Sequence, residues 1–300
     1  MNNSSGSSGN ILVCTDKGLL RVNEIENIKD LKCSVHKIGH LPSKKIFTKD
    51  GNELESSLNH IYTVVEDGKY TSKKVEELKV GDNLVVHLGG YPEKASDKLF
   101  KLEEKDIKIK QPEFLSADIA HILALVYRSG KIESKNKISF HPIDFENHSK
   151  ISKILSDIFG IEETYSIGYT IVVINEDFIR WLTLQGCFNN DVPYILRTAS
   201  KNNIISFMEN LWEPYSGYDN YVSLRNVGFG KELLVLARSI GYNVQAMIGN
   251  ICCFCRRAES RTPKERIYGD YWLDPIEKIE NSSCDIYSIE NEYILGSVLN

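Results

Sequence analysis

The chain has 300 residues and a formal net charge of −5 at pH 7, with 42% hydrophobic and 26% charged residues. This composition excludes a mainly disordered protein and is long enough for two domains, or for one domain inserted into another. No apolar run approaches the about 20 residues that cross a bilayer, and seven cysteines without a secretory signal predict free thiols. We therefore expect a cytoplasmic protein, or a nuclear one in a eukaryote, without a strongly basic face.

The N-terminal third has the pattern of an all-β unit. Residues 1–10 are rich in Ser, Gly and Asn and are predicted to be a flexible leader. From Ile11 to Leu88, short β-branched runs alternate with turn signals such as Asp16-Lys17-Gly18 and Glu66-Asp67-Gly68. Residues 91–111 are rich in Lys and Glu with little apolar periodicity, which predicts an exposed connector.

Beyond Pro112 the pattern changes to alternating helices and strands. A helix is predicted over Ser116 to Tyr127, with Ser116 as its N-cap and Gly130 after its end. The same order of helix, strand, helix, strand occurs twice, over 116–127, 137–141, 149–159 and 169–174, and again over 204–212, 221–224, 231–240 and 252–255. This repetition predicts an internal duplication, in a monomer that imitates a two-fold dimer.

The C-terminal segment returns to short β runs, over 275–279, 285–289 and 293–295. The first unit is therefore expected to be completed by the C-terminus, with the middle of the chain as an insertion.

One block of the N-terminal unit resembles a known family. Ser57-Leu58-Asn59-His60, followed by Gly68 and by Leu78-Lys79-Val80-Gly81-Asp82, resembles the intein and hedgehog-type (Hint) splicing fold. Ile11 to Ile25 is similar to that family's opening strands, and Tyr287 to Asn300 is similar to its closing block.

The resemblance implies acyl transfer, in which a first-residue Cys or Ser attacks the preceding carbonyl, the block histidine polarises the amide, and a terminal Asn cyclises. Ser57, His60 and Asn300 occupy the matching positions. Three departures weaken the match: the attacking residue is only loosely represented, Leu299 stands where a histidine is usual, and Ser288 stands where an aspartate is common. The candidates for the attacking residue are Ser5, Ser7 and Ser8. The resemblance therefore implies an intein-derived protein in which splicing is impaired.

The middle region resembles the LAGLIDADG homing endonucleases. The segments 122–130 and 209–217 align with the two motif helices, and Val192-Pro193-Tyr194-Ile195 is similar to the stretch before the second motif. In that family each helix delivers a carboxylate to Mg²⁺ just before its terminal glycine. Ser129 and Ser216 stand at those positions, and an alcohol lacks the charge to hold the ion. We expect no metal cofactor; Mg²⁺ would bind only if nuclease activity remained, through substitute acids drawn from Glu133, Glu213 and Asp219.

Together these resemblances imply an α+β multidomain chain. A Hint horseshoe would be formed by both chain ends, around an inserted pseudo-two-fold αββαββα unit. The expected boundaries are a leader at 1–10, a β unit at 11–110 and 273–300, and an insert at 111–272 with halves 113–190 and 191–272.

Double-stranded DNA is the expected partner of the insert, with weak affinity, because residues 115–275 hold 17 basic and 18 acidic side chains. The candidate phosphate contacts are Lys135, Lys137, Arg225, Arg256, Arg257 and Arg261. Two alternatives stay open: a functional endonuclease that uses substitute acids, and a non-catalytic DNA-binding or maturase-like module.

Two further patterns favour structural roles. Cys252, Cys253 and Cys255 lack a second Cys or His pair at zinc-finger spacing, so a strand with free thiols is predicted. His36 and His40 have helical spacing, but Gly39 and Pro42 disfavour a helix, so the two histidines are expected at the surface or in a turn.

Overall fold

The computed structural model describes residues 5–93, 96–141, 145–162, 164–168, 170–212, 220–224, 227–242, 244–248, 252–256, 267–268 and 271–290. Helices and strands both occur throughout, so the predicted α+β class is confirmed. No helix in these ranges is long and apolar enough to cross a membrane.

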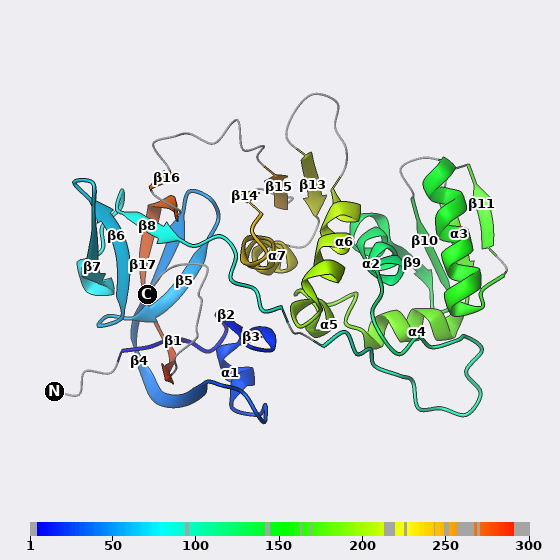
Figure 1. The fold of residues 1–300 in the computed structure, drawn as a ribbon, viewed down its shortest axis with the longest axis horizontal. Helices are drawn as coiled ribbons and strands as arrows, with labels where there is room; N and C mark the ends of the chain where they lie inside the picture. The colour runs from blue at the N-terminus through cyan, green and yellow to red at the C-terminus, as the bar shows by residue number, and fades with distance from the viewer. Residues whose placement is uncertain are drawn as a thin grey trace.

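One antiparallel sheet joins the two ends of the chain. Its strand order is β1-β5-β4-β17-β8-β6-β7, with β16 also paired to β17. The strands span Ser7–Ser8 (β1), Ser34–Thr48 (β4), Glu53–Ser57 (β5), Ile61–Glu66 (β6), Lys69–Lys74 (β7), Asn83–Val86 (β8), Ile267–Tyr268 (β16) and Tyr271–Glu290 (β17). In Figure 1 the red strand β17 lies among the blue and cyan strands of the N-terminal region. We refer to this sheet, with the elements that cover it, as the β unit.

The strands β4 and β17 form the longest ladder of the sheet, with Thr48 opposite Ile276 and Ser34 opposite Glu290. The separate strands predicted over 275–279 and 285–289 are therefore parts of one strand, and 293–295 lies outside the described residues. His36 and His40 lie within β4 rather than in a turn, and both are exposed, so the surface position predicted as an alternative is confirmed. Gly39, with φ +147°, lies between them, where the register shifts opposite Ile286 and Tyr287.

A small hairpin and a short helix complete the β unit. They are β2 (Leu12–Thr15), β3 (Gly18–Arg21) and α1 (Val22–Ile25), and η1 (Val75–Glu77) precedes β8. Val13, Leu20, Val22 and Ile25 form an apolar cluster on one side of the hairpin. A second apolar cluster is formed by residues of the main sheet, among them Ile46, Val64, Leu84 and Trp272.

The middle of the chain contains two smaller sheets, one of order β11-β12-β10-β9 and one of order β13-β15-β14. The elements of the first part are α2 (Ala117–Ser129), β9 (Lys131–Ser134), β10 (Lys137–Phe140), α3 (Phe145–Phe159), β11 (Thr164–Ile167), β12 (Thr170–Ile174) and α4 (Glu176–Leu184). Those of the second part are α5 (Tyr194–Arg197), α6 (Lys201–Leu211), β13 (Asn220–Leu224), α7 (Val227–Ser239), β14 (Val244–Ile248) and β15 (Cys252–Arg256). We call this region the middle unit.

Helix α2 shows why the helices of the middle unit could be predicted from the sequence. The Ser116 side chain accepts a hydrogen bond from the Ile119 amide, as expected for an N-cap, and Gly130 is the C-cap. Residues 119–126 of this helix are all buried, and it packs against α6. The eight predicted helices and strands of this region are all present, with ends shifted by a few residues.

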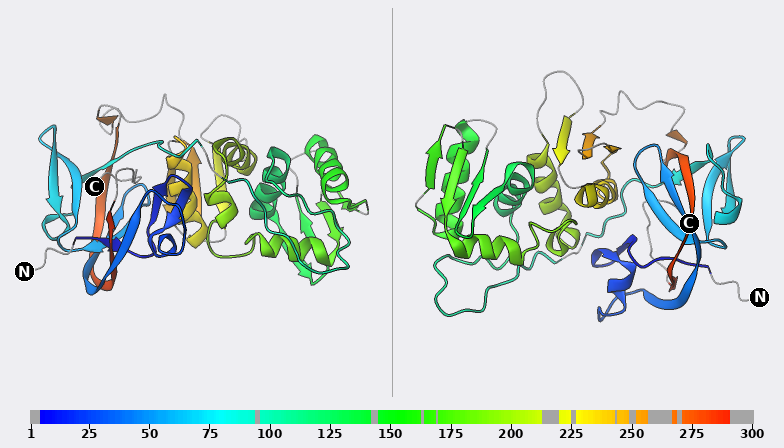
Figure 2. Two further views of the ribbon diagram at one scale, coloured as in Figure 1. Left: turned by 60° about the horizontal axis from the view of Figure 1, so that its bottom comes forward. Right: turned by 180° about the vertical axis from the view of Figure 1, so that it is seen from behind.

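The β unit and the middle unit share one apolar core. Cys14 and Leu19 of the hairpin belong to the same buried cluster as Ile122, Leu196 and Leu234 of the middle unit. Figure 2 shows the β2–β3 hairpin beside the helices of the middle unit in both views. The connector was expected to be exposed, but Tyr91, Leu99 and Ile109 are buried in this core. Because these apolar side chains are removed from water, the connector stabilises the contact between the units.

Candidate active site

The strands β1, β5 and β6 meet around His60. Ser57 is the last residue of β5, and a turn then brings His60 to the start of β6, with the His60 amide donating to the Ser57 carbonyl oxygen at 3.0 Å. The His60 carbonyl oxygen accepts from the Val75 amide at 2.8 Å. Both backbone groups of His60 are therefore fixed, and its side chain is almost fully buried.

The His60 ring contacts the start of the chain. Its Nδ1 lies 3.4 Å from Ser5 Oγ, so the neutral tautomer with a free Nδ1 can accept the Ser5 proton. The Tyr62 ring packs edge-on against His60, with centroids 4.9 Å apart. The Tyr62 hydroxyl lies 2.8 Å from Ser56 Oγ, and burial raises the pKa of Tyr62 to about 12. Tyr62 therefore stays neutral at ordinary pH and holds one side of the imidazole in place.

Ser57 holds the residue that follows Ser5. The Gly6 amide donates to Ser57 Oγ at 3.1 Å, and the Ser57 amide donates to the Gly6 carbonyl oxygen at 3.0 Å. The family resemblance assigns Ser57 and His60 to one site, and the structure brings them together through Ser5 and Gly6.

Gly6 has no room for a side chain. A Cβ atom on Gly6 would lie 2.2 Å from the Tyr287 carbonyl oxygen and 2.9 Å from a side-chain carbon of Ile286. Real Cβ contacts do not reach such distances, so the close approach of β17 requires glycine here. Strand β17 therefore lies directly against Gly6, next to the residue that contacts His60.

Of the three candidate attacking residues, Ser5 is the one that contacts His60. Ser7 Oγ lies 3.4 Å from Ser56 Oγ, and the hydroxyl of Ser8 lies beside the thiol of Cys284. Asn300 and Leu299 lie outside the described residues, while Ser288 lies in β17 opposite His36.

Ser129 lies at the end of α2, in the helix pair that the LAGLIDADG resemblance makes central. Its hydroxyl donates to the carbonyl oxygens of Leu125 and His141 and accepts from the His141 amide at 2.9 Å. The neighbouring Arg128 donates to the Asn210 carbonyl oxygen of α6 at 3.3 Å. This arrangement caps helix ends and places a cation between them. Ser216, Glu213 and Asp219 lie outside the described residues.

The candidate phosphate contacts that the structure describes are paired with acids. Lys137 Nζ lies 2.6 Å from a Glu133 oxygen, and Lys135 Nζ lies 3.5 Å from a Glu176 oxygen. These carboxylates reduce the positive charge offered to a phosphate. Arg256 ends β15, and its side chain is not described; Arg225, Arg257 and Arg261 lie outside the described residues. Within the described ranges, no three His, Cys, Asp or Glu side chains converge in a way that would hold a metal ion.

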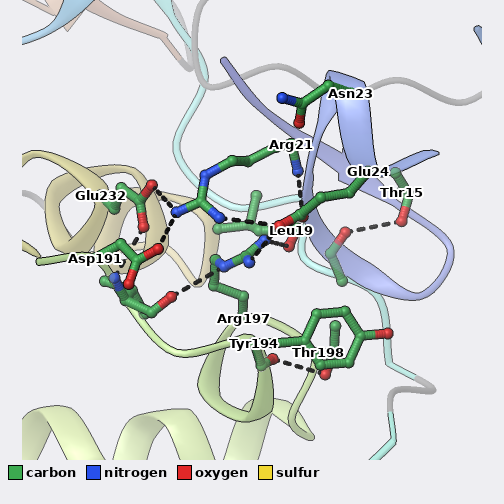
Figure 3. A network of polar contacts seen from close by, with 12 residues as sticks. Thr15, Leu19, Arg21, Asn23, Glu24, Asp191, Tyr194, Arg197, Thr198 and Glu232 are labelled. Carbon is green, nitrogen blue, oxygen red and sulfur yellow. Dashed lines mark hydrogen bonds and ion pairs between the residues drawn. The ribbon is translucent and has the colours of Figure 1, made fainter. Parts of the chain in front are cut away.

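An ion-pair network joins the two units and was missed in the sequence (Figure 3). Arg197, the almost fully buried last residue of α5, donates to both Glu24 oxygens at 2.7 and 2.8 Å and to the Leu19 carbonyl oxygen. Arg21 contacts Glu24, Asp191 and Glu232. Burial acts to raise the pKa of Glu24, but hydrogen bonds from Arg197 and Arg21 outweigh it and lower that pKa. In the sequence, the spacing of Glu24 three residues after Arg21 could have predicted their ion pair, which is one part of this network.

A Ser–His–Asp arrangement lies on the exposed face of the β4–β17 ladder. His40 Nδ1 and Nε2 each lie 3.3 Å from a partner, an Asp285 oxygen and Ser283 Oγ respectively, while Lys37 pairs with the same aspartate. The His40 side chain is 64% exposed. Water competes with contacts this open, so we interpret them as a surface network.

The four cysteines that the structure describes as free are Cys14, Cys33, Cys187 and Cys284. Burial raises the pKa of the Cys14 thiol to about 12, so this group stays protonated and serves in packing.

Comparison with known proteins gave matches among solved structures alone. No protein-family model matches the chain, and no curated protein matches it. The chain is similar to a mutant of an Ssp DnaB mini-intein variant, at 16% identity and a TM-score of 0.25, over 37% of this chain and 76% of that chain. It is also similar to a transcription factor IIB Mvu mini-intein, at 14% identity and a TM-score of 0.22, over 28% of this chain and 69% of that chain.

Proposed function

We propose that this chain is an intein-derived protein whose β unit carries out an acyl shift at Ser5. The contact between Ser5 Oγ and His60 Nδ1 is the observation that carries the proposal. A serine hydroxyl beside a buried imidazole is the pairing from which a nucleophile is activated by a general base. Hydrogen bonds in such sites are often long before the reaction, which suits the 3.4 Å separation.

The proposed reaction is an isomerisation of the peptide bond between residues 4 and 5. Ser5 Oγ attacks the carbonyl carbon of residue 4 as His60 takes the hydroxyl proton. The carbon–nitrogen bond then breaks, and the leaving Ser5 nitrogen receives the proton back from His60. The product is an ester on Ser5 Oγ with a free Ser5 amine, and no water or second substrate is consumed.

Ser57 and Gly6 orient the reacting residue in this scheme. The two backbone-centred hydrogen bonds between them fix the peptide that follows Ser5. Positioning of this kind lowers the barrier because the hydroxyl is already near the groups that it must meet. Complete splicing is proposed to be impaired, because Leu299 and Ser288 depart from the family pattern at the other junction.

Hydroxylamine tests the acyl shift, because it cleaves esters much faster than amides. The treated chain is expected to lose the segment before Ser5, and intact-mass measurement should give a product that begins at Ser5. Ser5→Ala and His60→Ala should abolish the release. Ser7→Ala is the matched control, since the Ser7 hydroxyl contacts Ser56 rather than His60. Equal release from the wild-type chain and Ser5→Ala would overturn the proposal.

For the middle unit we propose a LAGLIDADG-derived fold without nuclease activity and with weak DNA affinity. The packed pair α2 and α6 and the repeated order of elements support the derivation. The hydrogen bonds of Ser129 and the acid-paired lysines support the loss of function. A supercoiled plasmid library with Mg²⁺ or Mn²⁺ should stay uncut, and specific linearisation would favour a nuclease with substitute acids. Gel-shift affinity above nonspecific levels would favour a DNA-binding or maturase-like module.

Splicing itself has a separate assay. With flanking segments added at both ends, mass spectrometry should show no ligated product. A ligated product would contradict the proposed impairment.

A further inference from the structure

We propose that helix α7 of the middle unit positions the acyl-transfer site, with Lys231 and Arg238 as positioning residues. This inference rests on the proposed function at Ser5. It extends that function by making the site dependent on a unit that lies outside it.

Strand β5 connects the region near α7 with the acyl-transfer site. It begins at Glu53, directly after the turn at residues 49–52, and ends at Ser57. At about 3.3 Å per residue, Ser57 lies roughly 13 Å along the strand from Glu53. The way that the turn and Glu53 are held therefore sets where Ser57 meets Gly6.

Charged side chains of helix α7 contact both Glu53 and the turn at residues 49–52. Lys231 Nζ pairs with the Glu53 carboxylate. Arg238 donates through Nη2 to the Asp50 carbonyl oxygen at 3.2 Å, and it also donates to the Val244 carbonyl oxygen. The Arg238 side chain is 1% exposed, so its charge is removed from water.

Arg238 lies near the buried Asp274 carboxylate and contacts the backbone of a second buried aspartate, Asp50. An Asp274 oxygen lies 3.8 Å from Arg238 Nη1, and Asp274 and Asp50 are both 0% exposed. Thr48 Oγ1 and Asn52 Nδ2 donate to Asp274 at 2.6 and 2.7 Å, and Trp272 donates to Asp50 at 2.6 Å. Burial raises the pKa of Asp274, and the positive charge of Arg238 acts to lower it. The counter-charge for this acidic cluster thus comes from the middle unit.

Packing alone does not hold the turn against α7. A cavity of about 350 Å³ lies between them, lined by Gly51 and Glu53 on one side and by Gly228 and Lys231 on the other. The Lys231–Glu53 pair bridges this gap, so its loss lets the first residues of β5 shift together with their partners on β4. A displaced Ser57 loses its hydrogen bonds to Gly6, and Ser5 then moves away from His60.

The first test measures hydroxylamine release from the full chain carrying Lys231→Met. We expect the release rate to fall at least about five-fold while the melting temperature changes little, because a half-exposed pair contributes little to stability. The charge swap Lys231→Glu with Glu53→Lys should restore the rate. Lys137→Met, which breaks the Glu133 pair on a distant sheet, is the matched control and should release at the wild-type rate.

The second test removes the buried positive charge of Arg238 together with the negative charge of its partner Asp274. Arg238→Met alone leaves Asp274 without its counter-charge and can fail to fold, so the informative chain is Arg238→Met with Asp274→Asn. We expect this folded double variant to release at least about five-fold more slowly than wild type, because the Asp50 carbonyl oxygen has lost its donor. Wild-type rates in both this chain and Lys231→Met would overturn the inference.

A separate readout distinguishes failure of the inference from failure of the proposed function. Absence of any ester in the wild-type chain would refute the acyl shift, but positioning would still be measured by hydrogen exchange at the amides of Ser57 and His60. These amides should exchange faster in Lys231→Met than in Lys137→Met. Equal exchange in the two variants would refute the positioning role.

Discussion

Replacing Arg197 by methionine should destabilise the whole chain, because this arginine joins the two units from a buried position. The change removes the paired hydrogen bonds to Glu24 and those to the carbonyl oxygens of Leu19 and Val192. Breaking a buried ion pair costs about 3–5 kcal/mol. Arg21 still neutralises Glu24 at 2.9 Å in the variant, so we expect the lower end, about 3 kcal/mol.

This free energy converts into a measurable change in melting temperature. At about 2.1 cal/mol/K per residue, unfolding of 300 residues carries an entropy of about 0.6 kcal/mol/K, so the melting temperature should fall by about 5 °C. Scanning calorimetry on the full chain measures the shift. Arg180→Met is the matched control, since Arg180 pairs with Glu104 and Asp177 at a partly exposed position, and it should melt with the wild type. A shift below about 1 °C for Arg197→Met would refute a structural role for the network.

Three further predictions follow from single residues. Gly6→Ala should slow hydroxylamine release on the order of 100-fold, because the added Cβ would displace β1 from β17 and Ser5 from His60. Ser8→Ala is the control. An unchanged release rate in Gly6→Ala would contradict the tight approach of Tyr287 to Gly6. Burial lowers the pKa of His121 from 6.5 to about 4, so between these pH values the unfolded chain binds a proton at His121 and the folded chain does not. The free energy of unfolding should therefore fall as the pH drops from about 6.5 to 4. His121→Gln should flatten that part of a urea-midpoint profile, and an unaltered slope would exclude His121 as its source. Ser129→Ala should lower the free energy of unfolding by about 1 kcal/mol in urea, since the His141 amide loses its acceptor, and Ser129→Thr should retain most of it.

Local signals in the sequence predicted the helices of the middle unit well. Helix α2 combines an N-cap serine, apolar residues at helical spacing and a glycine after its end, all within fifteen residues. Each of these signals acts between near neighbours, so tertiary contacts were not needed to interpret them. The LAGLIDADG-like duplication was likewise inferred from the order of such segments, and it stays a prediction.

Contacts between distant parts of the chain could not be predicted in the same way. Strand β17 was divided into short pieces because its partner β4 precedes it by more than two hundred residues, and charged side chains interrupt its apolar pattern. The choice of Ser5 over Ser7 and Ser8 depends on how β1 pairs with β5 and β17, which three neighbouring serines do not reveal. No local pattern marks Arg197 or Arg238 as buried, because their burial arises only when the two units meet.

The place of β17 in the sheet has a consequence for the order of events during synthesis. Ser7 and Ser8 pair with Tyr287 and Ile286, so strand β1 is completed by a strand that is synthesised more than two hundred residues later. Sheets closed by such distant partners form slowly, after the helices have already folded locally. The site around Ser5 is therefore assembled only after β17 has been synthesised, which protects the nascent chain from premature rearrangement of its own backbone.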